Sequence, residues 1–204
     1  MTLLQKPSLV KLSVSVSNLD FFRTWRAEED LPLSKLLERL LGTAEQTDAM
    51  KAGNAFHEAL ERAGEGELNT LALGDYRFDF NCDCNIEKLD IHELSVEKYY
   101  GDLLVRGRVD GLNGKEITDY KTTSQFDPDR LMSGYQWKYY LDMMECDHFK
   151  WEAFVLAERG YNDGQYCYEV TQHHTLRQNR YPELAADCAQ LAREYSDFAK
   201  EYLL

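Results

Sequence analysis

The sequence lacks any apolar run that approaches the roughly 20 residues required for a helix to cross a bilayer. Its N-terminus lacks the basic segment and continuous apolar stretch of a secretory signal peptide. No repeat, low-complexity stretch or linker divides its 204 residues, of which 44% are hydrophobic. These features predict a cytoplasmic protein without a membrane partner, folded as a single domain over residues 1–204.

Positive charge is scarce: 23 lysines and arginines stand against 36 aspartates and glutamates, a net charge of -13. Such a balance disfavours long-range attraction to nucleic acid, which usually depends on cations that neutralise phosphates. The objection weakens if carboxylates gather at a cation site, because a bound divalent metal reverses the local field. Total charge therefore does not exclude a nucleic-acid substrate.

Cysteines are few, odd in number and mostly far apart: Cys82, Cys84, Cys146, Cys167 and Cys188. This pattern favours reduced thiols over a disulfide scaffold. The first two have the C-x-C spacing of a metal chelate, but no second pair completes a zinc site. A structural role is the favoured interpretation.

What is present is an ordered series of amphipathic segments, mainly helical in residues 1–66 and rich in strands from residue 70. Helical spacing predicts helices over Leu19–Ala27, Leu31–Leu41, Thr47–Ala63, Asp127–Glu145 with a break at Gly134, and Glu183–Leu204. Alternation predicts extended segments over Ser8–Val16, Tyr76–Asn81, Ile86–Leu94, Leu103–Leu112, Lys115–Thr123, Phe149–Ala157 and Gln165–Thr171. The order indicates an α/β (α+β) fold, a central mixed sheet flanked by helices, with a helical N-terminal part.

Asn113 and Gly114 predict a two-residue type I′ hairpin turn between two of these strands. Counting outward places Asp110 opposite Ile117 and Arg108 opposite Asp119. Asp110 and Asp119 then become diagonal neighbours on one face, with Cβ atoms roughly 7 Å apart.

Lys121 shares that face with Asp119 because side chains alternate along a strand. Two carboxylates can hold Mg²⁺, and a nearby ammonium can orient or deprotonate a water and stabilise a phosphoryl transition state. The alternative is an ordinary cross-strand ion pair between Arg108 and Asp119.

Three tracts resemble motifs of one family. Val109-Asp110-Gly111 followed by Ile117-Thr118-Asp119-Tyr120-Lys121-Thr122 resembles the signature of RecB-like nucleases in the PD-(D/E)XK superfamily. Upstream, Gly53, His57 and Glu61 resemble the family motif G-x-x-x-H-x-x-x-E, and downstream Gln136 and Tyr140 resemble Q-x-x-x-Y, also found in CRISPR-adaptation nucleases. The three occur in the family's order, which implies a restriction-endonuclease-like core.

The resemblance implies a metal-dependent DNA nuclease. His57, Asp110, Asp119 and the carbonyl of Tyr120 would hold Mg²⁺ or Mn²⁺, Lys121 would assist the attacking water, and Glu61 is a weaker catalytic candidate that is otherwise a solvated helix charge. Gln136 and Tyr140 would help to place DNA. The candidate phosphate contacts are Arg106, Arg108 and Arg130.

Many relatives hold an iron–sulfur cluster with one early and three late cysteines, but no cysteine precedes Cys82 here. We therefore expect no cluster. The expected activity is that of an exonuclease in DNA recombination, repair or processing, acting as a homo-oligomer or with a recombination partner protein. The alternatives are a structure-selective endonuclease, a catalytically silent nuclease-fold binding subunit and an acidic mimic of nucleic acid.

Overall fold

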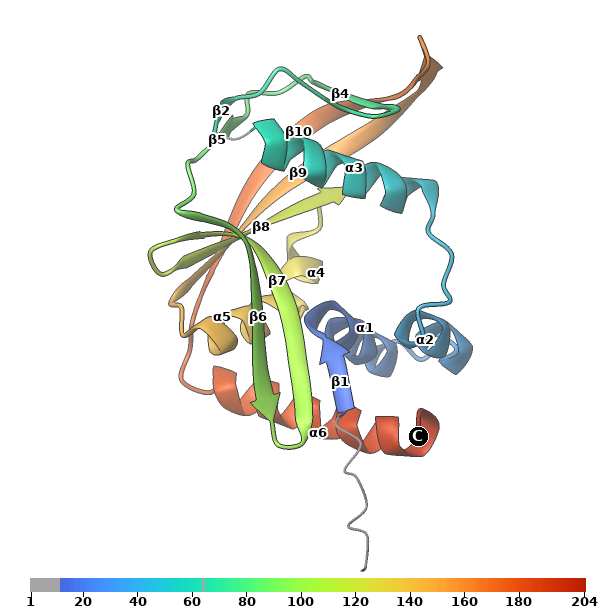
Figure 1. Ribbon diagram of the computed structural model, residues 1–204, viewed down its shortest axis with the longest axis vertical. Helices are drawn as coiled ribbons and strands as arrows, with labels where there is room; N and C mark the ends of the chain where they lie inside the picture. The colour runs from blue at the N-terminus through green and yellow to red at the C-terminus, as the bar shows by residue number, and fades with distance from the viewer. Residues whose placement is uncertain (1–11, 64) are drawn as a thin grey trace, which may run out of the picture.

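A computed structural model describes residues 12–63 and 65–204 (Figure 1). Within them, eight strands form a mixed sheet in the order β1-β7-β8-β9-β10-β4-β3, with β6 on the other edge of β7. These strands are β1 (Leu12–Ser15), β3 (Thr70–Leu73), β4 (Tyr76–Phe80), β6 (Ile91–Tyr100), β7 (Leu103–Asn113), β8 (Glu116–Thr123), β9 (His148–Asn162) and β10 (Gln165–Asn179). A separate two-stranded ladder joins β2 (Gly66–Glu67) to β5 (Asn85–Ile86).

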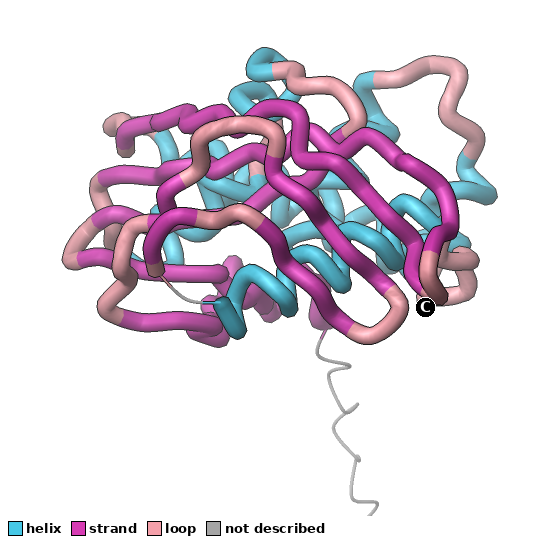
Figure 2. Tube along the Cα trace, turned by 90° about the horizontal axis from the view of Figure 1, so that it is seen from above, coloured by secondary structure: helices cyan, strands magenta, loops and turns pink. Residues whose placement is uncertain are grey.

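Six helices accompany the strands, which form a twisted layer when seen from above (Figure 2), and α2 packs on α1. Within the described ranges they are α1 (Val16–Ala27), α2 (Leu33–Leu40), α3 (Asp48–Ala63), α4 (Pro128–Ser133), α5 (Gln136–Met144) and α6 (Leu184–Tyr202). Local sequence sets two of the starts. Ser15 caps α1 by accepting from the N–H of Asn18, and Asp127 caps α4 by accepting from the N–H of Arg130.

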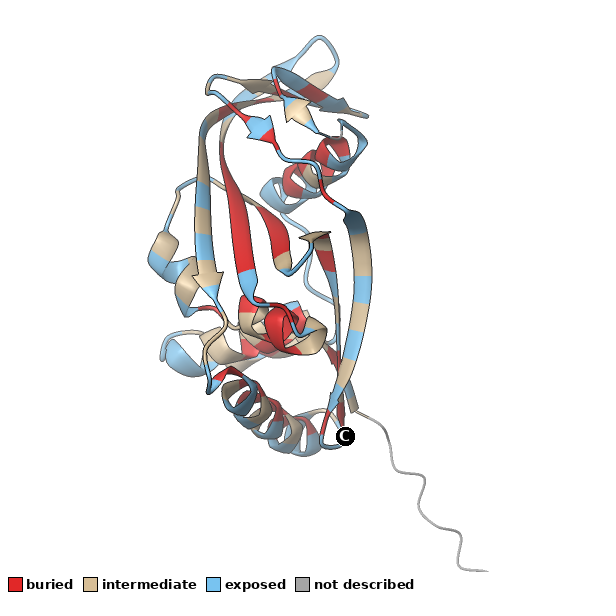
Figure 3. Cartoon of the chain, turned by 90° about the vertical axis from the view of Figure 1, so that its left-hand side faces the viewer, coloured by how far each residue is buried: buried red, intermediate tan, exposed pale blue. Residues whose placement is uncertain are grey.

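Two hydrophobic clusters support the sheet, and the buried residues concentrate where helices face strands (Figure 3). The larger joins α1, α5 and α6 to β7 and the start of β9, and the smaller packs α3 on β3, β4 and β10. Phe56 of α3 is fully buried, with its ring centroid 5.1 Å from that of Phe78 and 4.8 Å from that of Phe154. Strand β8 serves both clusters, since Ile117 belongs to the larger and Tyr120 to the smaller.

Gly53 permits the close approach of α3 to β8. A Cβ atom at this position would lie 2.8 Å from the Oγ1 of Thr122, closer than atoms of this kind pack. The first residue of the G-x-x-x-H-x-x-x-E tract is therefore explained by packing, and the contact sets the distance from His57 to the strand that carries Asp119.

The β7–β8 hairpin differs from the predicted one. Asn113 pairs with Glu116, so Gly114 and Lys115 are the turn residues, and of these two only Gly114 has positive φ (53°). Type II′ turns take glycine at the first central position, whereas type I′ requires positive φ at both. Asn113 instead accepts a hydrogen bond from the N–H of Asp90, which holds it in the strand. The predicted type I′ turn is wrong.

The observed ladder ends where Gly111 pairs with Thr118, and Ile117 pairs with Leu112. The predicted pairings of Asp110 with Ile117 and of Arg108 with Asp119 are therefore wrong.

Other expectations agree with the structure in type more than in extent. The helical region after Asp127 does break at Gly134, into α4 and α5. The strand predicted over Ile86–Leu94 is divided between β5 and β6, because residues 87–90 form the connection that bonds to Asn113. Strands β9 and β10 extend well beyond their predicted ends, and the part of the predicted segment Ser8–Val16 before residue 12 lies outside the described residues.

No helix in the described ranges is long and apolar enough to span a bilayer. All five cysteines are free thiols.

Candidate functional site

The candidate site lies where one edge of β7 changes its partner. β1 pairs with this edge up to residue 106 and β8 from residue 111 onward, so residues 107–110 have no strand partner there among the described strands. Two hydrogen bonds are made to β7 in this unpaired segment. The Tyr140 hydroxyl donates to the carbonyl of Arg108 at 2.9 Å, and the N–H of Tyr120 donates to the carboxylate of Asp110 at 2.7 Å. Asp110 thus bridges the fork between the strands.

Asp119 and Lys121 occupy the β8 side of the fork. Asp119 is 3% exposed, and Lys121 Nζ lies 3.1 Å from its Oδ1 and 2.8 Å from its Oδ2. Oδ2 is buried and, despite this ionic contact, accepts no hydrogen bond of good geometry from the described residues. A buried carboxylate oxygen in this condition is costly unless a cation or a donor reaches it.

Charge and burial shift the titration of the groups around the fork. Burial, followed by the repulsion from Asp119, raises the pKa of Asp110 from its ordinary 3.8 to about 7. Burial alone would lower the pKa of Lys121, but the attraction of Asp119 raises it. The ammonium form of Lys121 is therefore favoured at neutral pH.

His57 faces this group from α3. Burial, together with the charge of Lys121, lowers its pKa from 6.5 to about 4, against the opposing effect of Asp119. The imidazole is neutral at pH 7 and keeps a nitrogen lone pair available to a metal.

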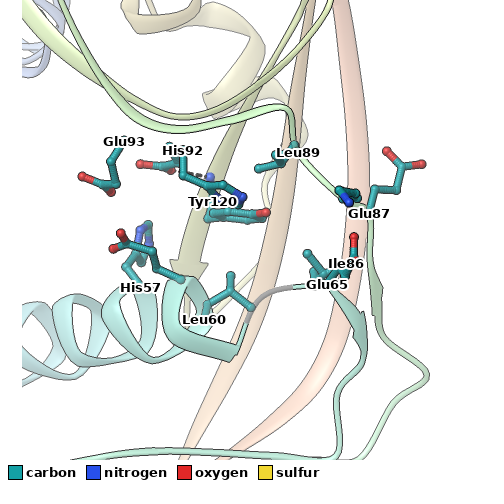
Figure 4. A pocket seen from close by; sticks show the side chains of 12 residues that line it. His57, Leu60, Glu65, Ile86, Glu87, Leu89, His92, Glu93 and Tyr120 are labelled. Carbon is teal, nitrogen blue, oxygen red and sulfur yellow. Dashed lines mark hydrogen bonds between the residues drawn. The ribbon is translucent and has the colours of Figure 1, made fainter.

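His57, Glu61 and Asp110 all line a cavity of about 280 Å³, which we call the acidic cavity. Figure 4 shows His57 and Glu93 at one end of it and Tyr120 between them and Glu87. The cavity also receives Glu65, so that five carboxylate side chains face it, against one lysine, Lys88. Of the G-x-x-x-H-x-x-x-E tract on α3, Gly53 lies against β8, and His57 and Glu61 line the cavity.

Gln136 also reaches the predicted site. Its Nε2 donates to Asp119 Oδ1 at 3.4 Å, a long hydrogen bond. Tyr140, one turn later on α5, is buried and touches β7 through its hydroxyl. The two residues of the Q-x-x-x-Y tract therefore contact the two strands that carry the carboxylates.

The arginines predicted to contact phosphate separate into two groups. Arg106 and Arg108 are exposed, and they do not line the acidic cavity. Arg108 instead forms an ion pair with Glu93, with 2.6 Å between Nη1 and Oε2. Glu93 was not a sequence candidate. It has φ of 54°, a conformation rare for a residue with a side chain, and its charge adds to the pKa increase of Asp110.

Arg130 lines a second cavity of about 640 Å³ beside the end of β8, which we call the arginine cavity. Tyr120 lines the acidic cavity, whereas the next residue, Lys121, lines the arginine cavity together with Gln136. Two further cations of this cavity, Arg23 and Arg39, were not sequence candidates. They lie on α1 and α2, far from the recognised tracts, and no local motif distinguishes them from other helix-surface arginines.

The donor set suits a divalent cation. As placed, no three histidine, cysteine, aspartate or glutamate side chains within residues 12–63 and 65–204 converge closely enough to ligate an ion. The ammonium of Lys121 occupies the open side of Asp119 instead. A neutral imidazole, two carboxylates and a buried Asp119 oxygen without a hydrogen bond nevertheless provide the ligand types that Mg²⁺ and Mn²⁺ use.

Comparisons with known proteins concern the fold. No family model matches the chain, and no curated protein matches it in sequence. A phage-related exonuclease from Haemophilus somnus aligns over 96% of this chain and 98% of its own, with a TM-score of 0.50 and 14% identity. An alkaline exonuclease from Laribacter hongkongensis aligns over 94% and 91%, with a TM-score of 0.44 and 14% identity. The fold is a central mixed sheet flanked by helices, consistent with a restriction-endonuclease-like core.

Proposed function

We propose that the chain is a metal-dependent nuclease that hydrolyses phosphodiester bonds in DNA, as an exonuclease of the RecB-like branch acting in recombination, repair or processing. The observation that carries the proposal is the fork between β7 and β8. It brings together Asp110, Asp119 and Lys121, and leaves a buried oxygen of Asp119 without a hydrogen bond. The likeness to the fold of a phage-related exonuclease supports it.

His57, Asp110, Asp119 and the carbonyl of Tyr120 would hold Mg²⁺ or Mn²⁺. Bound there, the cation would neutralise phosphoryl charge and make a water more acidic. The pKa of Asp110 is raised first by burial and then by the charge of Asp119, and a cation bound between these two carboxylates would favour their ionised forms. Glu61 lies in the same cavity and could complete the acidic set.

Lys121 acts as an ammonium. Its raised pKa favours the protonated form, so of the two predicted roles, orienting the water and removing its proton, the first is better supported. Three N–H donors placed beside Asp119 can orient the nucleophilic water and stabilise charge on the phosphoryl oxygens. Gln136, which reaches Asp119, would position the reacting strand.

The remaining expectations are proposals of the same kind. Assembly as a homo-oligomer or with a recombination partner protein, a cytoplasmic location, a single domain over residues 1–204 and the absence of an iron–sulfur cluster are predictions from the sequence. Phosphate contacts of Arg106 and Arg108 would require Arg108 to leave Glu93.

The test is the degradation of end-labelled linear DNA and closed circular DNA in Mg²⁺, in Mn²⁺ and in EDTA. We expect metal-dependent loss of the linear substrate and survival of the circle. Cutting of the circle would favour the structure-selective endonuclease. An intact linear substrate with either metal would contradict the proposal and leave the silent binding subunit as the interpretation.

A further inference from the structure

The arginine cavity carries chemistry that the proposed hydrolysis does not use. Its lining residues come from α1, α2, α4, α5, the end of β8, the loop after β8 and the strand β9, segments that are far apart in the sequence. Four cations face it, namely Arg23, Arg39, Lys121 and Arg130. A volume of about 640 Å³ is within the range of about 300–1,000 Å³ typical of small-ligand sites.

Two of the three carboxylates lining this cavity are engaged by the main chain. Asp20 accepts from the N–H of Tyr135, and Asp127 accepts from the N–H of Arg130. The third is Glu28. The positive side chains therefore outnumber the acidic ones, in a chain whose total charge is -13.

Arg23 and Arg39 have unused hydrogen-bonding capacity. The Nε of each is buried and has no hydrogen-bond acceptor among the described residues. Arg23 Nε lies 3.9 Å from Asp20, and Arg39 stacks its guanidinium over Phe21 at 4.8 Å from the ring centroid. Guanidinium groups with free N–H donors match the oxygens of a phosphate, which are acceptors only.

An aromatic ring completes the cavity. Phe126 lines it and stacks on His174 from β10, with centroids 4.1 Å apart and planes 7° from parallel. His174 does not line the cavity, so it supports the ring from outside, and its Nε2 is fixed in turn by a 2.8 Å hydrogen bond with Gln172. A fixed, half-buried ring beside guanidinium groups is the arrangement on which a nucleobase stacks.

We propose that the arginine cavity binds one nucleotide of an unpaired DNA strand, with its phosphate on Arg23, Arg39 and Arg130 and its base on the ring of Phe126. This inference rests on the proposed function for the identity of the polymer. Because Lys121 lines the same cavity, the bound nucleotide is next to the bond that would be cut. Stacking on Phe126 requires a base free of its complementary strand, so binding selects single-stranded over duplex ends.

The test is fluorescence anisotropy with a labelled oligothymidylate and a blunt duplex of equal length, in EDTA so that no cutting occurs. We expect the wild type to bind the single strand more tightly. Phe126→Leu should weaken this binding about fivefold or more, and Phe126→Trp should preserve it. Arg39→Gln should weaken it and reduce the slope of log affinity against log salt by about 1.

Two variants serve as matched controls. Arg26→Gln removes a guanidinium from the same helix as Arg23 but from an ion pair with Glu194 outside the cavity. Tyr161→Leu removes an exposed ring that contacts Tyr166 at the tip of the β9–β10 hairpin. Both should bind the oligonucleotide as the wild type does, and thermal unfolding should show every compared variant folded.

The outcomes separate this proposal from the nuclease proposal. Equal affinity for single strand and duplex, or wild-type binding by folded Phe126→Leu and Arg39→Gln variants, would overturn the nucleotide site. Selective binding that both variants weaken supports the site even if the protein cuts no DNA in Mg²⁺ or Mn²⁺, in which case only the nuclease proposal fails.

Discussion

The two cavities beside β8 have opposite charge although adjacent residues of one strand line them. Five carboxylates and one lysine face the acidic cavity, whereas four cations and three carboxylates face the arginine cavity. The change of sign occurs along β8, between Tyr120, which lines the acidic cavity, and the segment from Lys121 to Thr123, which lines the arginine cavity. The net charge of -13 therefore does not describe the field that a substrate would meet at the fork.

This difference assigns separate tasks to the two faces. The acidic cavity suits a cation, and the arginine cavity suits the phosphates of a strand. The reaction would take place at their boundary, where Asp119 and Lys121 form an ion pair. If the division is correct, damage to one face should leave the function of the other measurable.

The largest effect is expected from Asp119→Asn, which removes a charged ligand from the acidic side. We expect metal-dependent DNA cutting to fall by more than about a hundredfold, while oligonucleotide binding in EDTA changes little. The measurement is the initial rate in saturating Mg²⁺. Asp197→Asn, on an exposed aspartate of α6, is the control and should cut at the wild-type rate. Equal losses of cutting and of oligonucleotide binding in EDTA would show that the two faces are not separable.

Lys121→Gln should lower the cutting rate by about 10²–10³-fold, the effect of removing one transition-state donor. It should also strengthen Mn²⁺ binding, since the ammonium no longer competes for Asp119. Titration calorimetry with Mn²⁺ measures the second effect. Weaker Mn²⁺ binding in the variant would argue that Lys121 holds Asp119 in place for the cation and does not compete with it.

A pH effect of intermediate size should follow from Asp110. Its pKa is raised to about 7 in the folded, metal-free protein, so protonation stabilises the fold. This contribution is complete below the ordinary value near 4 and is lost as the pH rises through about 7. The urea midpoint of the wild type in EDTA should therefore fall between pH 5 and pH 8 by more than that of Asp110→Asn. Parallel pH dependence in the two proteins would contradict the burial of an uncompensated charge at the fork.

The sequence predicted the proximity of the charged hairpin residues, but it did not single out Arg23, Arg39 or Phe126 of the arginine cavity, and the reason is physical. Asp110, Asp119 and Lys121 belong to one hairpin, and local pairing rules bring them close even when the turn is placed one residue too early. His57 required the resemblance in addition, because α3 reaches β8 only through tertiary packing at Gly53.

The arginine face depends on contacts that no local pattern encodes. Arg23, Arg39 and Phe126 come from a helix, a second helix and a loop that meet only once the chain is folded. Glu93 likewise lies near Asp110 through the pairing of β6 with β7, in a backbone conformation that its residue type does not indicate. For Arg106 and Arg108, sequence spacing gives the face of the strand but not the neighbouring side chains, such as Glu93 beside Arg108.

The smallest effect should come from Gly53→Ala, which changes the spacing between α3 and β8 without touching a charge. Alanine favours the helix by roughly 1 kcal/mol over glycine, but the added Cβ would lie 2.8 Å from Thr122 Oγ1, so the net change in unfolding free energy should stay within about 1 kcal/mol. Cutting should nevertheless decrease severalfold, because displacement of α3 carries His57 away from Asp119. Adding Thr122→Ala removes the obstructing hydroxyl and should restore the rate. Failure of the double variant to recover, with its stability intact, would mean that the distance of His57 from β8 does not control the reaction.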